Sequence, residues 1–324
     1  MPDVSSDDWT IGHLIEWTRT FFAQKGVDQP RLEAEILLAH VLGLGRIDLY
    51  MKYEEVVSEK DRAAYRDLVR RRAGGEPTRY LVGTCEFMSV AFKVTPDVLI
   101  PRPETEMLAE EVIRQVRAAA PPLAEAAALP EGMDATDAVL TPPDAEAGRP
   151  AIIELCTGCG VLAVSLAVHL PQARVTATDV SAAALEVART NAEAHGVADR
   201  VTLLSGDLYD ALDAADARPA DFLLANPPYV ADAEWEALAP EIRNHEPREA
   251  LVAGPDGTEI LERLVKGARA YLKPGGLLLV EMGEGHGRQA REMAEAARGL
   301  VDVEILKDYA GHDRVLRARR DEDG

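Results

Sequence analysis

Four consecutive residues, Asn226-Pro227-Pro228-Tyr229, place an amide, two prolines and an aromatic ring directly after the apolar run 222–225. The run predicts a short buried strand, and open α/β sheets keep their ligand sites just beyond the carboxyl ends of strands. Proline lacks an N–H and holds the preceding residue extended, so the segment is stiff and offers carbonyl oxygens without competing donors. Asn226 Oδ1 and the Pro227 carbonyl can accept both hydrogens of a planar NH2 group while the Tyr229 ring packs on its face. The sequence therefore predicts a site for chemistry on an amino or amide nitrogen.

A second candidate site is the turn 154–160, Glu-Leu-Cys-Thr-Gly-Cys-Gly, which follows the predicted strand 151–155. Gly158 and Gly160 would let a ligand approach the backbone closely, and the next helix offers its N-terminus. Asp179 ends the following strand, where a carboxylate can accept both hydroxyls of a ribose. The same spacing, Gly158-x-Gly160-x-x-Ala163 with Asp179, also satisfies the dinucleotide-binding fingerprint. The turn alone therefore leaves NAD and S-adenosylmethionine open.

Three features favour the methyl donor over the dinucleotide. Glu154 occupies the acidic place typical of methyltransferase loops, and Asp207 follows the third strand, where an acid can bind the amino group of adenine. The segment 226–229, which can accept the hydrogens of an NH2 group, follows the fourth strand. A dehydrogenase would need a partner for hydride transfer there, and it has no use for hydrogen-bond acceptors beside an aromatic ring. The expected donor-binding residues are Glu154, Cys156, Thr157, Gly158, Cys159, Gly160, Asp179, Asp207, Leu208 and Asn226.

The elements that must position these residues alternate between strand and helix after residue 150, which predicts a doubly wound α/β sheet. Strands are expected at 151–155, 174–178, 201–204, 222–225 and 277–280, and a helix at 181–195. Before them, apolar periodicity and capping residues predict helices at about 9–25, 30–43 and 58–72, with Leu32, Ile36, Leu37 and His40 on the inner face of the second. The expected organisation is a helical domain at 1–75, a hairpin and linker at 76–117, an Ala/Pro-rich mobile insertion at 118–149, and the sheet domain at 150–320.

Composition and charge exclude several other classes of protein. The 324 residues carry a formal net charge of −21, which opposes a broad grip on nucleic acid phosphates; Arg70-Arg71-Arg72 is interpreted as a solvated helix end. The apolar stretch 151–170 contains Glu154 and a glycine turn, so it predicts a strand and a helix rather than a membrane span. The first eight residues lack the regions of a signal peptide, and three cysteines suit a reducing cytoplasm. No second Cys or His pair accompanies Cys156 and Cys159, so no metal site is expected.

Several further stretches, taken in order, make the chain resemble the HemK/PrmC family of methyltransferases. Besides the turn 154–160 and the segment 226–229, the matching stretches are 71–77, 80–83, 86–87, Ile100-Pro101-Arg102-Pro103-Glu104-Thr105-Glu106, Glu246-Pro247-Arg248 and 307–314. The resemblance implies transfer of a methyl group from S-adenosylmethionine to the side-chain amide nitrogen (N5) of the glutamine in the Gly-Gly-Gln motif of peptide chain release factors.

The resemblance also implies a fold and a set of roles. A Rossmann-like class I methyltransferase has a seven-stranded sheet whose last strand is antiparallel, and segments 301–306 and 314–318 would form its final hairpin. The helical domain would help to hold the protein substrate. Asn226, Pro227 and Tyr229 would be catalytic, Asn226 to Tyr229 would bind the glutamine, and orientation in a water-poor pocket would take the place of a general base.

Two alternatives with a related site stay open. Enzymes that methylate a glutamine of a ribosomal protein share Asn-Pro-Pro-Tyr but vary the stretch 101–106, whose intact form here favours release factors. Adenine N6 and guanine N2 present a similar NH2 group, so an RNA or DNA amino methyltransferase is a second alternative, which the acidity of the chain opposes. A non-catalytic binding protein that keeps the fold is a third, opposed by the complete segment 226–229.

Cys156 and Cys159 depart from the family pattern, which has glycine and a small residue such as serine at these places. They are either small side chains tolerated beside the cofactor or, because a helix end lowers a thiol pKa, a pair that closes a disulfide under oxidation and blocks the donor. Arg102 and Glu246 either line the pocket or form a structural link between domains.

Overall fold

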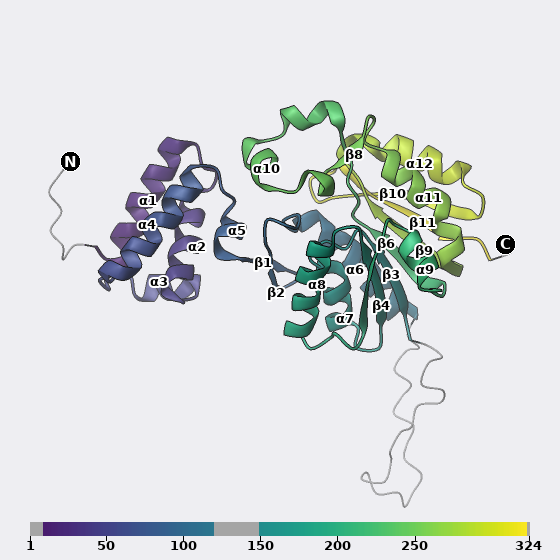
Figure 1. The fold of residues 1–324 in the computed structure, drawn as a ribbon, viewed down its shortest axis with the longest axis horizontal. Helices are drawn as coiled ribbons and strands as arrows, with labels where there is room; N and C mark the ends of the chain where they lie inside the picture. The colour runs from purple at the N-terminus through teal and green to yellow at the C-terminus, as the bar shows by residue number, and fades with distance from the viewer. Residues whose placement is uncertain (1–8, 120–148, 323–324) are drawn as a thin grey trace, which may run out of the picture. The chain divides into compact units, whose positions relative to one another are not determined.

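The computed structural model describes residues 9–119 and 149–322, so most of the expected insertion at 118–149 lies outside the described residues. The chain forms two compact units (Figure 1). The helical unit contains residues up to Cys85 together with Val94–Pro96 and Glu236–Pro247, and the sheet unit contains Glu86–Lys93, Asp97–Trp235 and the chain from Arg248 onward.

The helical unit is built from helices whose ends follow capping rules. Its helices are α1 (Ile11–Lys25), α2 (Pro30–Leu42), α3 (Arg46–Met51), α4 (Glu59–Ala73), α5 (Thr78–Val82) and α10 (Pro240–His245). Thr10 caps α1 by accepting from His13 N, Ser58 caps α4 by accepting from Asp61 N, and Pro30 starts α2. Their core contains the fully buried side chains Ile15, Phe22, Leu37, Leu38 and Leu49. The three long helices agree with the sequence prediction, whereas α3 and α5 are too short to show a period.

Two predictions for this unit are wrong in detail. His40 is exposed, because α2 turns Ala34, Leu37 and Leu38 inward. Arg72 does not belong to a solvated helix end: its side chain is 7% exposed and pairs with Glu33 at 2.8 Å and Glu241 at 2.9 Å. A buried guanidinium needs such partners, since an unpaired charge would cost several kcal/mol.

A hairpin of β1 (Thr84–Phe87) and β2 (Val90–Lys93) lies within the hairpin and linker region predicted at 76–117. Its two turn residues, Met88 and Ser89, have φ of 48° and 61°, which fits a type I′ turn without the usual glycine. The Met88 N–H donates to Glu106 Oε1 at 2.7 Å, which ties the turn to the start of α6 (Glu106–Ala119).

The sheet unit holds a seven-stranded sheet with the order β10-β11-β9-β6-β3-β4-β5. The strands are β3 (Ala151–Leu155), β4 (Arg174–Asp179), β5 (Val201–Ser205), β6 (Ala220–Ala225), β9 (Leu272–Glu281), β10 (Leu300–Lys307) and β11 (Asp313–Arg320). Only β11 is antiparallel, inserted between β9 and β10, so the expected final hairpin and antiparallel last strand are confirmed. Every strand that the sequence predicted is present.

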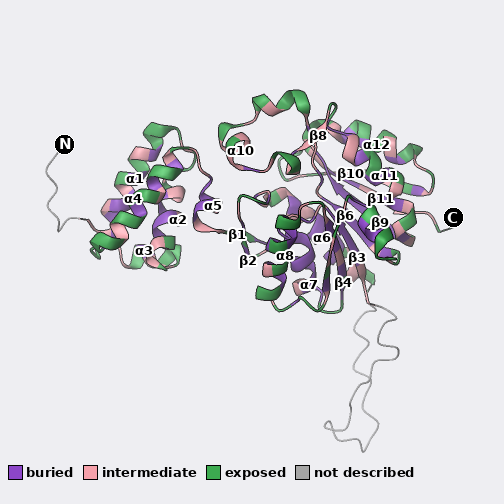
Figure 2. Cartoon of the chain, in the orientation of Figure 1, coloured by how far each residue is buried: buried purple, intermediate pink, exposed green. Residues whose placement is uncertain are grey.

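Helices cover both faces of this sheet. Alternate strand residues such as Ile153, Leu223 and Leu278 share one core with α9 (Asp210–Ala214), α11 (Glu259–Tyr271) and α12 (Gly287–Ala296). In Figure 1, α6, α7 (Val161–His169) and α8 (Ala182–Ala194) lie on the opposite side of the strands. Figure 2 shows the strands buried between helices whose outer faces are exposed. The stretch 151–170 divides into β3 and α7, and among the described helices none is both long and apolar enough to cross a membrane.

The strand register brings four chain segments to one edge. Leu155 of β3 pairs with Thr178 of β4 and with Ala225 of β6, which in turn pairs with Val280 of β9. The residues that follow them are therefore neighbours at the carboxyl edge: Cys156, Asp179, Asn226 and Glu281.

Candidate active site

The glycine turn at this edge is held from below by Glu154. Its side chain is buried in β3, and Oε2 accepts from the Thr157 hydroxyl at 2.7 Å and from the Ala163 amide at 2.9 Å. Burial raises the pKa of Glu154 to about 8. Gly158 and Gly160 have φ of 55° and 82°, a left-handed conformation that favours glycine. Glu154 and Thr157 thus brace the turn from the protein side.

Asp179 connects the turn with the second strand and suits a ribose. Its Oδ2 accepts from the Gly158 amide at 2.8 Å and its Oδ1 from the Ser181 amide at 2.9 Å. Each carboxylate oxygen can accept about two hydrogen bonds, so each keeps capacity for one hydroxyl. A side chain added at Gly158 would meet no atom within 4 Å, which shows open space beside the turn. These residues fit the nucleoside part of S-adenosylmethionine.

The third strand supplies Asp207 and Leu208, which face different surroundings. Asp207 is exposed and its Oδ2 accepts from Arg263 at 2.7 Å, so a bound amino group would share this carboxylate with the guanidinium. Leu208, with φ of 48°, is buried in the core shared with α9 and α11. Of this pair, Asp207 is the one whose side chain is accessible to a ligand.

Cys156 and Cys159 are free thiols. Burial and then the charges of Asp179, Glu154 and Asp207 raise the pKa of Cys156 well above its ordinary value. The lowered thiol pKa that the disulfide alternative needs is therefore wrong for Cys156, because the thiol is desolvated and lies near the carboxylate of Asp179. Cys159 is buried, and its carbonyl accepts from Asn191 Nδ2 at 2.8 Å. Within the described ranges no group of three or more His, Cys, Asp or Glu residues could hold a metal ion.

Asn226 is held by a chain of two further side chains. Its Nδ2 donates to Thr105 Oγ1 at 3.0 Å, and the Thr105 hydroxyl donates to Glu281 Oε2 at 2.7 Å. Thr105 and Glu281 are buried, whereas Asn226 is only partly buried. The carboxamide nitrogen therefore faces inward, and Oδ1, on the other side of the amide, is left for a ligand.

Tyr229 is fixed through its backbone and by two close glycines. Its N–H donates to the Leu251 carbonyl at 3.1 Å, and β7 (Val230–Ala231) then pairs with β8 (Val252–Gly254). A side chain at Gly283 would lie 3.3 Å from the Tyr229 ring, and one at Gly257 would lie 2.7 Å from its carbonyl. Burial raises the pKa of Tyr229 to about 12, so the phenol is neutral.

The structure thus gathers the turn 154–160, Asp179 and the segment Asn226 to Tyr229 at one edge of the sheet. Pro227 is buried and Pro228 partly buried beside Asn226. Arg102 belongs to the sheet unit, and its positive charge lowers the pKa of Tyr229, which burial raises. Glu246 is a buried residue of the helical unit.

Sequence reasoning missed the parts played by Thr105 and Glu281. Thr105 lies inside the stretch 100–106 that was used only for resemblance. Glu281 directly follows the predicted strand 277–280, the same signal that identified Asp179 and Asn226, and it could have been found in this way.

Comparison with known proteins finds family models that match both parts of the chain. A family model described as the PrmC N-terminal domain matches residues 13–83, and one described as the methyltransferase small domain matches residues 132–254. A release factor glutamine methyltransferase of Rhodopirellula baltica is 39% identical over 99% of this chain and 100% of its own length. One of Chlorobaculum tepidum is 40% identical over 95% of this chain and 96% of its own. A solved Thermus thermophilus 16S rRNA N2 G1207 methyltransferase shares 18% identity, with a TM-score of 0.47, over 73% of this chain and 49% of that one, a likeness too low to bear on the substrate.

The sheet, its glycine turn and the methyltransferase match define an S-adenosylmethionine-dependent methyltransferase with a Rossmann-like fold and an added helical domain. Within that class, the full-length relatives show that the chain belongs to the release factor glutamine methyltransferase family.

Proposed function

We propose that this protein methylates N5 of the glutamine in the Gly-Gly-Gln motif of peptide chain release factors. The observation that carries the proposal is the fixed Asn226 carboxamide: its nitrogen is bonded to Thr105, and its oxygen remains as an acceptor beside Pro227 and Tyr229. Relatives of nearly the same length bear the name release factor glutamine methyltransferase.

The proposed chemistry depends on orientation. An amide nitrogen is a poor nucleophile because its lone pair is delocalised into the carbonyl. Asn226 Oδ1 and the Pro227 carbonyl would accept the two hydrogens of the glutamine amide, which aims the nitrogen and stabilises positive charge developing on it. The neutral Tyr229 ring would pack on the amide plane. S-adenosylmethionine, when bound, supplies an electrophilic methyl group on a sulfonium.

The residues expected to hold the donor lie around the turn 154–160. Gly158 and Gly160 would line the nucleoside and Asp179 would accept the ribose hydroxyls, while Asp207 would accept from the adenine amino group. Glu154, Cys156, Thr157, Cys159 and Leu208 would shape the site from behind. This division of roles follows from which side chains are buried, packed against the core or already hydrogen-bonded inside the protein.

The decisive experiment is mass spectrometry of a release factor after incubation with enzyme and donor, looking for one methyl on the Gly-Gly-Gln glutamine. Asn226→Ala should abolish transfer while the dissociation constant for the donor, measured by calorimetry, stays within about threefold. Asn244→Ala, at an exposed asparagine of α10, is the matched control. Unchanged turnover in Asn226→Ala would remove this residue from the reaction.

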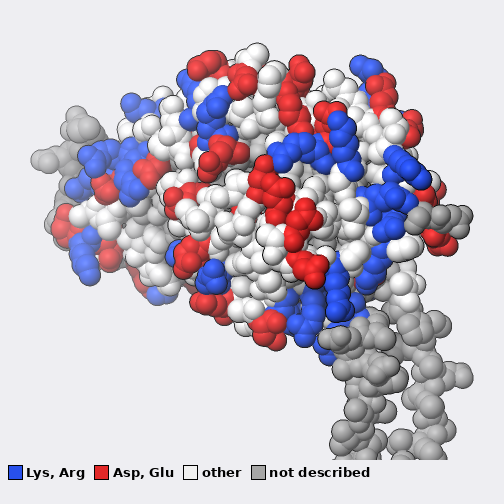
Figure 3. All heavy atoms as spheres, turned by 45° about the vertical axis from the view of Figure 1, so that its right-hand side comes forward, with Lys and Arg blue, Asp and Glu red and all other residues white. Residues whose placement is uncertain are grey.

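Acceptors of other chemistry are tested in the same assay. A ribosomal protein, RNA and DNA replace the release factor in parallel reactions, and methylation of any of them at a higher rate contradicts the proposal. Net charge disfavours nucleic acid. On the face shown in Figure 3 acidic and basic side chains are interspersed over most of the surface, and basic side chains gather near its lower right edge. Because release factors act where translation occurs, we place the activity in the cytoplasm.

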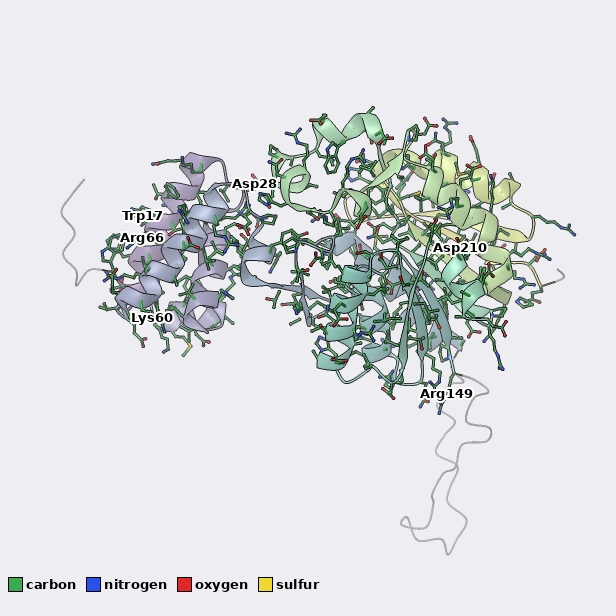
Figure 4. All side chains as sticks on the ribbon, in the orientation of Figure 1. Trp17, Asp28, Lys60, Arg66, Arg149 and Asp210 are labelled. Carbon is green, nitrogen blue, oxygen red and sulfur yellow. The ribbon has the colours of Figure 1, made fainter. Side chains whose placement is uncertain are left out.

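We also propose that the helical unit helps to hold the protein substrate. A cavity of about 480 Å³ lies between α1 and α4, lined by Trp17, Tyr65, Arg62 and Arg66 among others. Trp17 and Arg66, labelled in Figure 4, come from different helices of this unit. Trp17 is 46% exposed although its ring stacks on Phe21. An exposed aromatic beside arginines is typical of protein interfaces.

A further inference from the structure

Thr105, Asn226 and Glu281 come from three separate places in the sheet unit. Thr105 ends the short 3-10 turn Pro103–Thr105 before α6, Asn226 follows β6, and Glu281 ends β9. The relative exposures of Thr105 and Glu281 are 2% and 1%, so water does not compete for their hydrogen bonds. This buried series of hydrogen bonds ends at Asn226, the side chain on which the proposed reaction depends most.

The hydrogen bonds that join Asn226, Thr105 and Glu281 have a fixed donor-to-acceptor direction when Glu281 is ionised. A carboxylate can only accept, so the single hydroxyl proton of Thr105 must go to Glu281. Thr105 Oγ1 can then only accept from Asn226, which requires the Nδ2 side of the amide to face it. A carboxamide rotated by 180° would place Oδ1 against the lone pairs of Thr105 and leave a buried repulsion instead of a hydrogen bond.

We propose that Thr105 and Glu281 are positioning residues that hold the Asn226 carboxamide in a single orientation, with its oxygen toward the substrate amide. The proposal rests on the proposed glutamine methylation and adds what selects between the two rotamers of Asn226. The Glu281 charge also polarises the chain, which makes Asn226 Oδ1 a stronger acceptor when charge develops on the substrate nitrogen.

The environment of Glu281 makes the device sensitive to pH. Burial raises the pKa of Glu281 to about 7, the Thr105 hydrogen bond and the charges of Arg314 and Arg102 lower it, and the Glu104 charge raises it. Tyr229, which is neutral, is the other titratable group coupled to it. Below this pH the protonated carboxyl can donate to Thr105, whose own proton is then free to face Asn226. The donor-to-acceptor direction of these hydrogen bonds is then no longer fixed, and the turnover rate should fall.

The test compares Thr105→Val, Thr105→Ser and Glu281→Gln in steady-state methylation of a release factor. Thr105→Val keeps the shape but removes the acceptor, and kcat should fall by about 10- to 100-fold, the scale expected for a misplaced catalytic group. KM for the release factor and the dissociation constant for the donor should stay within about threefold. Thr105→Ser restores the hydroxyl and should recover most of kcat. Glu281→Gln should lower kcat and abolish the acidic limb of the kcat profile near pH 7.

Two variants control for loss of a buried polar group as such. Ser165→Ala removes a buried hydroxyl of α7, and Glu111→Gln removes a buried carboxylate of α6; both should keep the wild-type kcat and pH profile. Thermal unfolding of all variants shows which of them are folded, and Thr105→Ser and Glu281→Gln decide the question if Thr105→Val does not fold.

Each outcome has one meaning. Wild-type kcat in Thr105→Val, equal losses in Thr105→Ser and Thr105→Val, or an unchanged acidic limb in Glu281→Gln would overturn the positioning role while leaving glutamine methylation standing. If the wild-type enzyme itself leaves the release factor glutamine unmodified, the proposed function fails, and the positioning role fails with it.

Discussion

Each carboxylate oxygen of Asp179 accepts one hydrogen bond from the protein, from the Gly158 amide or the Ser181 amide. Each oxygen can therefore accept one more hydrogen bond from a ligand. Asp179→Ala should weaken binding of S-adenosylmethionine by about 10- to 100-fold, because a hydrogen bond to a charged group contributes about 1.5–3 kcal/mol. Isothermal titration calorimetry measures the dissociation constant for S-adenosylmethionine. Asp221→Ala is the control, since Asp221 pairs with Lys273 and the Ala151 amide instead. Equal affinity in the two variants would rule out a ribose role for Asp179.

Individual residues were predictable where type and strand position coincide. Asn226 follows an apolar run and Asp179 ends a predicted strand, and these positions alone placed both residues at the carboxyl edge of the sheet. The bond from Thr105 to Glu281 joins residues 176 positions apart, and no local pattern in the sequence announces such a pairing. A lowered pKa of Cys156 belonged to the disulfide alternative, and the structure raises that pKa instead, because the thiol is desolvated and lies near carboxyl groups that the sequence shows only at distant positions.

At the scale of elements, the turn between β3 and α7 depends on a carboxyl group that burial keeps protonated. The unfolded pKa of Glu154 is 4.5 and the folded value about 8, so the unfolded chain releases this proton first as pH rises. Glu154 therefore lowers stability progressively between these values, by at most roughly 5 kcal/mol at about 1.4 kcal/mol per pKa unit.

Glu154→Gln should cancel this pH dependence, because glutamine keeps an acceptor for Thr157 and Ala163 but does not ionise. The stability of the variant relative to wild type should rise from pH 5 to pH 8, as measured by calorimetric unfolding without donor. A difference that stays constant over this range would show that Glu154 is ionised in the folded protein.

The pair of helices α1 and α4 gives a second prediction at this scale. Trp17→Ala should raise KM for the release factor by about 10-fold or more, since exposed aromatic anchors at interfaces contribute on the order of 2 kcal/mol, without changing kcat or donor affinity. Ile47→Ala, at a residue of α3 that is 77% exposed, is the control. If Trp17→Ala leaves KM unchanged, the cavity between α1 and α4 does not hold the substrate.

Helices were predictable where their apolar periodicity is long, and strands were predictable where an apolar run marks them as buried. The parallel strands and the helices α1, α2, α4 and α8 follow from apolar runs and caps such as Ser58 and Ser181. The helices α3 and α5 span only six and five residues, too few for a period to emerge. The hairpin turn at Met88 and Ser89 carries no glycine, so its left-handed conformation is imposed by tertiary contacts such as that with Glu106.

At the scale of the whole molecule, every candidate donor contact lies in the sheet unit. Donor at 100 times its dissociation constant should stabilise that unit by about 2.7 kcal/mol through mass action. Hydrogen exchange should therefore slow at 154–160 and in β3, β4 and β6, with α1, α2 and α4 unchanged. Equal protection of the helical unit would show that the two units unfold as one.

The chain Asn226–Thr105–Glu281 also makes catalytic competence a late event in folding. Its two bonds close over 121 and 176 residues, so they form only after distant segments have found their register in the sheet. Helices such as α8 form from local contacts and can precede it. Recovery of methyl transfer on refolding should consequently lag behind recovery of helical structure, and a partly folded molecule, even one that already holds its cofactor turn, would release no methylated product.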